Sequence, residues 1–165
     1  AAECGINLID TAECYGDHLS EQLIGERIQR DRDKWIVATK FGHGFTGFLE
    51  RTQEWSADAV RRQLEGSLRA LRTDYIDLYQ FHSGDDAVFD NHELWSMLRA
   101  QVESGTVRHL GISISSSGDR LHQVEQASAV GAEAIQVVYN RLERAPAPSS
   151  DASALPAVYM LLLDE

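Results

Sequence analysis

The sequence contains few cysteines and no long apolar run. Its two cysteines, Cys4 and Cys14, lie in neither a CxxC nor a Cys/His spacing. Two thiols are too few for a disulfide framework, which favours a reducing compartment, and their spacing favours inert thiols over metal ligands. The longest apolar segment, residues 157–163, is far too short to cross a bilayer, and the N-terminus lacks a signal sequence. We therefore expect a cytoplasmic chain with no metal and no membrane partner.

Positive charge is also scarce. The 15 Lys and Arg residues face 26 Asp and Glu residues, so the formal net charge is −11. This balance argues against a nucleic-acid partner, although a local basic pocket could still hold a phosphorylated cofactor. With 165 residues, 43% of them hydrophobic, the chain can form one domain with a real core. It does not begin with Met, and we expect it to be processed or cut from something longer.

Apolar segments of two kinds alternate along the chain. Short continuous runs predict strands, and runs with apolar residues three or four positions apart predict helices. Ser56 and Asn91 are suitable N-caps, and Gly105 and Gly131 are suitable helix stops. The predicted strands cover residues 6–10, 35–40, 75–82, 107–114 and 134–138, and the predicted helices cover residues 19–28, 57–71, 92–104 and 119–130.

These five βα units predict a parallel sheet covered on both faces. A doubly wound sheet and a β/α barrel both fit. However, Gly42–Gly47, the one GxGxxG spacing, follows the second strand and opens no capped helix, so it is a poor phosphate loop. We predict a (β/α)8 TIM-barrel type, incomplete because a closed barrel needs about 250 residues. Residues 1–144 would form the partial barrel. Residues 145–165 would form an Ala/Pro/Ser-rich tail, with one strand or helical turn at 157–163.

Polar residues end each predicted strand. In parallel barrels such positions meet at the carboxyl face, where active sites lie. The strand-end residues are Asp10, Lys40, His82, Ser113 and Gln136, and Tyr15 follows in the loop after Asp10.

Four of these residues suit carbonyl reduction. The ammonium of Lys40 would lower the pKa of Tyr15, which would donate a proton, and Asp10 would hold Lys40 in place. A neutral His82 would donate a hydrogen bond to the substrate carbonyl oxygen. Such a site fits hydride addition from a nicotinamide cofactor to an aldehyde or ketone.

Each of these residues also has a structural interpretation. Asp10 could cap a turn, Tyr15 could be an exposed turn residue, Lys40 could be a solvated strand end, and His82 could be a buried core histidine. Lys40 could also form a Schiff base, but a neighbouring carboxylate argues against this because it keeps the lysine charged. The joint pattern favours the catalytic interpretation.

Five segments of the sequence resemble signatures of the aldo-keto reductase family and follow one another in the family's order. The signatures are Gly5–Gly16 (GINLIDTAECYG), Ser20–Gly25 (SEQLIG), Ala38–Gly42 (ATKFG), Leu71–His82 (LRTDYIDLYQFH) and Gly105–Ser113 (GTVRHLGIS). The resemblance runs from about Ala1 to Arg144 and implies an oxidoreductase acting on a small carbonyl or alcohol substrate.

The resemblance also implies roles for residues. It implies a catalytic tetrad of Asp10, Tyr15, Lys40 and His82, with Tyr15 as the acid and NADPH as the usual cofactor. Ser113 and Gln136 would hold the nicotinamide carboxamide, and Asp10 would contact the ribose. The family's first strand would precede Ala1, and the segment that binds the cofactor phosphates would follow Arg144. The alternative function is therefore an inactive fragment or an assembly module.

Overall fold

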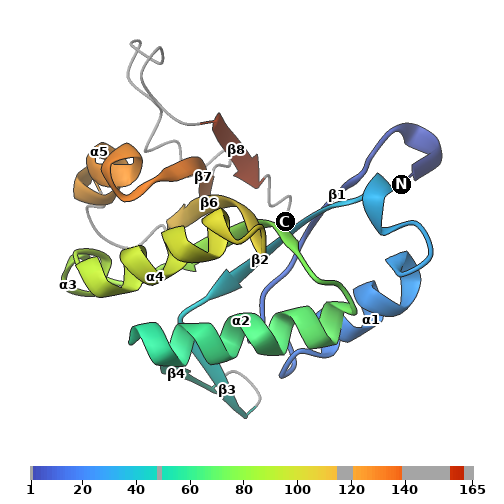
Figure 1. Cartoon of the computed structure of the whole chain (residues 1–165), viewed down its shortest axis with the longest axis horizontal. Helices are drawn as coiled ribbons and strands as arrows, with labels where there is room; N and C mark the ends of the chain where they lie inside the picture. The colour runs from blue at the N-terminus through green and yellow to red at the C-terminus, as the bar shows by residue number, and fades with distance from the viewer. Residues whose placement is uncertain (1, 48–49, 115–120, 139–156, 162–165) are drawn as a thin grey trace.

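The computed structural model describes residues 2–47, 50–114, 121–138 and, for the backbone alone, 157–161. Its centre is one parallel sheet of six strands in the order β1-β2-β5-β6-β7-β8 (Figure 1). The strands are β1 (Leu8–Asp10), β2 (Ile36–Phe41), β5 (Ile76–His82), β6 (Val107–Ile114), β7 (Ala132–Val138) and β8 (Ala157–Leu161). The predicted parallel, incomplete barrel is confirmed as a half-barrel.

Helices follow most of the strands and pack on the sheet or on one another. They are α1 (Leu19–Ile28), α2 (Ala57–Leu71), α3 (Asp86–Phe89), α4 (His92–Glu103) and α5 (Leu121–Val130), with 3-10 turns at Ala2–Cys4 and Arg32–Lys34. α2 packs on β2, α4 on β6, α5 on β7, and α1 on α2. Both predicted caps are present: Ser56 Oγ accepts from the Ala59 amide, and Asn91 Oδ1 accepts from the amides of Glu93 and Leu94. Among the described residues, no helix is both long and apolar enough to cross a membrane.

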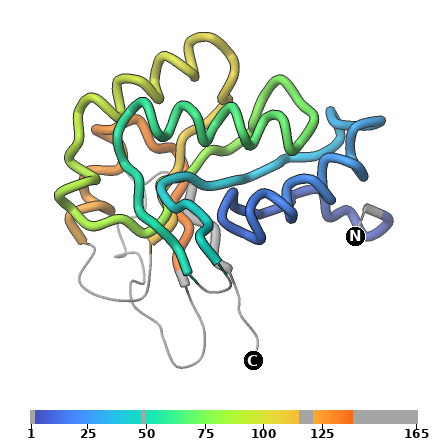
Figure 2. Tube along the Cα trace, turned by 90° about the horizontal axis from the view of Figure 1, so that it is seen from below, coloured from blue at the N-terminus to red at the C-terminus, as the bar shows by residue number. Residues whose placement is uncertain are grey.

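One addition to the predicted organisation lies between β2 and α2, where no strand was predicted. There β3 (His43–Gly47) and β4 (Glu50–Gln53) form a β-hairpin, which projects from the body of the chain (Figure 2). Gly42 precedes this hairpin, in agreement with its rejection as a phosphate loop. The sixth strand, β8, pairs with β7 and lies within residues 157–163, where one strand or helical turn was predicted. The expected linker at 145–155 and the start of the last predicted helix at 119 lie outside the described residues.

The two faces of the sheet differ because side chains alternate along each strand. Val37, Tyr79, Phe81 and Ile112 belong to the main apolar core that the helices cover. The alternate positions carry polar residues such as Lys40 and Gln80, together with a separate apolar cluster of Ala38, Leu78 and Ala134. The inner face is therefore the polar face of the sheet.

One edge of the described part is apolar and exposed. β1 ends the strand order, and Ile6, Leu8 and Ile36 near it are exposed. Leu19 and Leu23 on α1 are exposed as well, whereas Ile28 on the same helix is buried. β1 is thus an edge strand of the described sheet with exposed apolar residues beside it.

Gly25 sets the distance between α1 and α2. A Cβ atom added at this position would lie 2.6 Å from the Ala70 carbonyl oxygen and 2.7 Å from the backbone of Leu71. Because these are backbone atoms of a packed helix, they cannot move aside as a side chain could. We expect Gly25→Ala to lower the free energy of unfolding by about 1–3 kcal/mol, measured by urea denaturation. Gln22→Ala, at an exposed position of the same helix, is the control, and equal stability of the two variants would contradict the tight contact.

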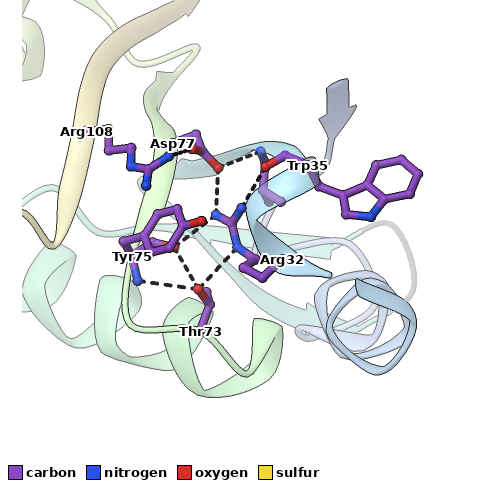
Figure 3. A network of polar contacts seen from close by, with 7 residues as sticks. Arg32, Trp35, Thr73, Tyr75, Asp77 and Arg108 are labelled. Atoms are coloured by element: carbon purple, nitrogen blue, oxygen red, sulfur yellow. Dashed lines mark hydrogen bonds and ion pairs between the residues drawn. The ribbon is translucent and has the colours of Figure 1, made fainter. Parts of the chain in front are cut away.

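An arginine–aspartate network ties the start of the sheet together (Figure 3). Asp77 Oδ2 accepts from Arg32 at 2.6 Å and from the Val37 amide at 3.0 Å, and Oδ1 accepts from Arg108 at 2.7 Å. The ring of Tyr75 lies between the two guanidinium groups, 4.1 Å from Arg32 and 3.9 Å from Arg108. Because these residues join the segment before β2 to β5 and β6, the network fixes the spacing of three neighbouring segments.

Candidate active site

The strand-end residues predicted from the sequence lie side by side on the inner face. Lys40 is paired in register with Gln80, His82 with Ser113, and Ser113 with Gln136. Parallel pairing of this kind brings the carboxyl ends of the strands to one edge. The structure therefore brings the predicted strand-end residues, including Asp10 at the end of β1, together from five strands.

Asp10 is the centre of this polar group. Its Oδ2 atom accepts from Lys40 Nζ at 2.7 Å and from Gln136 Nε2 at 3.2 Å, and its Oδ1 atom accepts from Gln80 Nε2 at 3.3 Å. Lys40, which is only 2% exposed, also donates to the Thr11 carbonyl at 2.8 Å. Because Nζ of Lys40 is engaged by Asp10 and the Thr11 carbonyl, it is not free to attack a substrate carbonyl, which disfavours the Schiff-base chemistry considered for Lys40.

Gln80 is a member of this group that the sequence analysis missed. It lies within the apolar run of β5, where we treated its neighbours as core. The signal was present, because Gln80 precedes His82 by two positions and must therefore share its face of the strand.

Tyr15 reaches the group from the turn between β1 and α1. The turn is held by hydrogen bonds from the Tyr15 amide to the Ala12 carbonyl and from the Ser20 amide to the Tyr15 carbonyl. The phenol ring lies 5.6 Å from Lys40 Nζ, and its centre is 6.3 Å from that of the His82 ring, edge to face. Tyr15 is 39% exposed, so its ring stays open to a ligand on this side of the sheet.

The electrostatics of Tyr15 differ from the prediction. We expected Lys40 to lower the pKa of Tyr15. Instead, burial raises that pKa above 10, and the negative charge of Asp10 raises it further, while Arg51 opposes the change. The Lys40 ammonium, which is held against Asp10 and the Thr11 carbonyl, does not offset the effect of burial. Tyr15 therefore keeps its proton throughout the neutral pH range.

His82 is neutral, as predicted. Burial, with His43 and Lys40 nearby, lowers the pKa of His82 to about 3. His43 packs edge to face on His82, with 4.9 Å between ring centres, and its Nε2 atom lies 2.5 Å from the His82 carbonyl oxygen. Because the backbone of His82 is held in place, its neutral imidazole can donate one hydrogen bond without adding positive charge to the site.

Glu13, another residue that we missed, lies buried beside this group. Its Oε1 atom accepts from the His43 amide at 3.1 Å, and burial raises the pKa of its carboxyl to about 8. The folded chain thus holds a proton here that the unfolded chain releases above about pH 4.5. This contribution to stability is complete below that pH and is lost as the pH rises through 8.

We expect Glu13→Gln, which mimics the protonated acid, to weaken this loss of stability. The difference between wild type and variant should be at most about 1.4 kcal/mol for each pH unit between 5 and 8. Urea denaturation at several pH values measures it, with the exposed Glu26→Gln as control. Parallel stability curves for wild type and Glu13→Gln would contradict a buried, protonated Glu13.

Two residues of the group fit a nicotinamide carboxamide. Gln136 donates through Nε2 to Asp10, while its buried Oε1 atom has no hydrogen-bond partner among the described residues. Such an acceptor suits the amide N–H of a carboxamide. Ser113 lies next to Gln136 in register, and its backbone carbonyl accepts from the Ser83 amide at 2.9 Å and from the Ser83 hydroxyl at 3.2 Å. The Ser113 hydroxyl can then serve a second contact to the same ligand.

Known proteins resemble this chain over most of its length. The model of the aldo/keto reductase family matches residues 1–151. The chain is 37% identical over 132 residues to a Glycine max protein named "Probable aldo-keto reductase 1", covering 78% of this chain and 38% of that protein. The chain thus spans well under half the length of this relative.

Solved structures resemble it as well. A glycerol dehydrogenase from Gluconobacter oxydans is 32% identical, with a TM-score of 0.80, covering 98% of this chain and 50% of the other. An aldo/keto reductase from Klebsiella pneumoniae in complex with NADP and acetate is 28% identical, with a TM-score of 0.65, covering 83% of this chain and 44% of the other.

Proposed function

Because the chain belongs to the aldo/keto reductase family of oxidoreductases, we propose that it carries the proton-transfer half of an NADPH-dependent carbonyl reductase. The reaction would reduce an aldehyde or ketone, or oxidise the corresponding alcohol. The observation that carries this proposal is the Lys40–Asp10 ion pair beside a protonated Tyr15 and a neutral His82.

In this proposal Tyr15 is the general acid. Its phenol, which burial keeps protonated, would donate to the carbonyl oxygen as negative charge develops there. His82 would donate a hydrogen bond to the same oxygen and orient it. Lys40 would stabilise the phenolate left on Tyr15, and Asp10 would fix the position of Lys40. For alcohol oxidation the same groups would act in reverse, with Tyr15 accepting the proton.

NADPH would supply the hydride when bound. We propose that Gln136 and Ser113 hold its carboxamide and that Asp10 lies beside its ribose. Support comes from the unpartnered Gln136 Oε1 atom among the described residues and from the NADP-bound Klebsiella pneumoniae relative. The net charge of −11 supports small-molecule substrates over nucleic acid, and we propose a cytoplasmic location.

The decisive experiment follows NADPH absorbance in the purified chain with a panel of aldehydes and ketones, alongside a direct NADPH titration. We expect micromolar binding and measurable turnover. Neither binding nor turnover would favour the alternative, an inactive fragment or assembly module. Because the chain covers only 38% of the Glycine max relative, the same assay should also be carried out on any longer natural form of the protein.

Gln136→Ala should weaken NADPH binding. The change removes the carboxamide acceptor together with one of the three side-chain donors to Asp10. Loss of a hydrogen bond in a buried site costs about 1–3 kcal/mol, which corresponds to roughly 5- to 150-fold in Kd. Fluorescence titration measures the effect, and Gln126→Ala on the exposed side of α5 is the control. Equal Kd values for wild type and Gln136→Ala would remove Gln136 from the cofactor site.

A further inference from the structure

Three side chains with metal-binding atoms converge behind the proposed proton-transfer group. Glu13 and Cys14 follow β1, and His82 ends β5. All three are buried, and one ligand atom from each lies within 4.8 Å of the other two. Around a tetrahedral zinc ion, with bonds of 2.0–2.3 Å, such atoms lie about 3.5 Å apart. Small side-chain movements would therefore bring all three onto one cation.

Two of the side chains have buried atoms that the described part of the chain leaves unsatisfied. Glu13 Oε2 and His82 Nδ1 have no hydrogen-bond partner there, although Glu13 Oε1 accepts from the His43 amide. An unsatisfied buried polar group costs about 1–3 kcal/mol, so native proteins seldom retain one without a bound water or ion. Both atoms belong to residues more than nine-tenths buried.

The three ligand types select one class of cation. A thiolate and an imidazole favour zinc and similar transition metals over magnesium and calcium, which prefer oxygen ligands. Burial raises the pKa of Glu13 to about 8 and that of Cys14 to about 11, so binding of the cation would release a proton from each. The two negative charges formed in this way would balance a divalent ion. Lys40, the nearest ammonium, is already paired with Asp10 and repels the ion less for that reason.

We propose that Glu13, Cys14 and His82 form a binding site for one zinc-like divalent cation, with the fourth coordination position open. The geometry reverses the interpretation of Cys14 as an inert thiol. A bound ion would restrain the His82 ring, and we expect it to inhibit any reaction that needs His82 free to meet a substrate. The binding itself does not depend on the proposed reductase function.

The test titrates zinc chloride into the chelator-treated chain by calorimetry. We expect one ion per chain, with affinity lowered at least 10- to 100-fold in Cys14→Ser and in Glu13→Gln, a loss typical even of outer-shell partners. Cys4→Ser, at the exposed second cysteine, is the matched control and should bind as wild type does. Cobalt(II) gives a second readout, because a thiolate ligand adds a sulfur-to-metal charge-transfer band that Cys14→Ser should lose.

Three results would overturn the site: no stoichiometric binding, binding unchanged in Cys14→Ser, or a cobalt spectrum of the wild-type chain without the thiolate band. The last readout uses the unmodified protein, so it decides even when a variant fails to fold. Tyr15→Phe separates the two proposals, since it should leave zinc affinity unchanged whatever it does to carbonyl reduction.

Discussion

Tyr15→Phe should lower kcat for carbonyl reduction by about 10²- to 10⁴-fold, the range that a positioned general acid contributes. The substitution removes only the hydroxyl, so the ring keeps its place near Lys40 and its edge-to-face contact with His82. The other members of the proposed tetrad are less suited to donate this proton, because His82 is neutral and Lys40 is held by Asp10. Steady-state assays with NADPH, in the protein that contains this chain, measure the effect.

Tyr79→Phe is the matched control for this experiment. Its hydroxyl is buried in the apolar core, has no hydrogen-bond partner among the described residues, and faces away from the polar group. Its loss should leave kcat within about twofold, because it changes no group in the site and surface or core changes of this size cost little. NADPH affinity should be the same in both variants. A Tyr15→Phe enzyme with wild-type kcat would exclude Tyr15 as the acid.

Asp77→Ala should lower the free energy of unfolding by about 3 kcal/mol, the lower end of what breaking a buried ion pair costs. The substitution leaves the mostly buried Arg32 without its carboxylate and the Val37 amide without its acceptor. It also removes the carboxylate partner of Arg108. Urea denaturation monitored by circular dichroism measures the change.

Asp58→Ala provides the comparison for a solvent-exposed pair. Asp58 and Arg61 are 3.6 Å apart and both at least half exposed, so water screens their attraction. Its removal should cost less than about 1 kcal/mol. Arg108→Ala should fall between the two, because Arg108 is 53% exposed and Arg32 still satisfies Asp77. Equal losses for Asp77→Ala and Asp58→Ala would show that the network in Figure 3 does not stabilise the sheet.

Elements with strong local signals could be predicted from the sequence. Val107–Ile114 forms a strand with the predicted bounds, and Ser56 and Asn91 cap the helices that their positions suggested. In each case a continuous apolar run or a capping side chain within the element itself determines whether a strand or a helix forms there. The parallel arrangement followed because buried strands alternate with helices.

Elements without such signals were missed. The hairpin strand Glu50–Gln53 is exposed along its whole length, so it has no apolar alternation to reveal it. The short helix Asp86–Phe89 depends on a cap from Asp85 and on one buried residue, Phe89. Both are too short or too polar for periodicity to detect them.

The site shows the same division between local and long-range effects. Strand ends located Lys40 and His82, because position along a strand fixes them. The raised pKa of Tyr15 and the contact of Gln80 with Asp10 depend on which charges and amides meet across the sheet. Those contacts depend on the register between strands that are distant in the sequence. The residues of one strand alone do not determine that register.

Asp10 has a consequence for the order in which the chain folds. Its partner Lys40 is 30 residues away, whereas Gln136 is 126 residues away. Closing the longer loop costs more chain entropy, and non-local contacts form more slowly. The ion pair can therefore form while β7 is still unfolded, and the carboxylate gains its last donor only when β7 docks. We expect hydrogen exchange during refolding to protect the amides of β2 before those of β7.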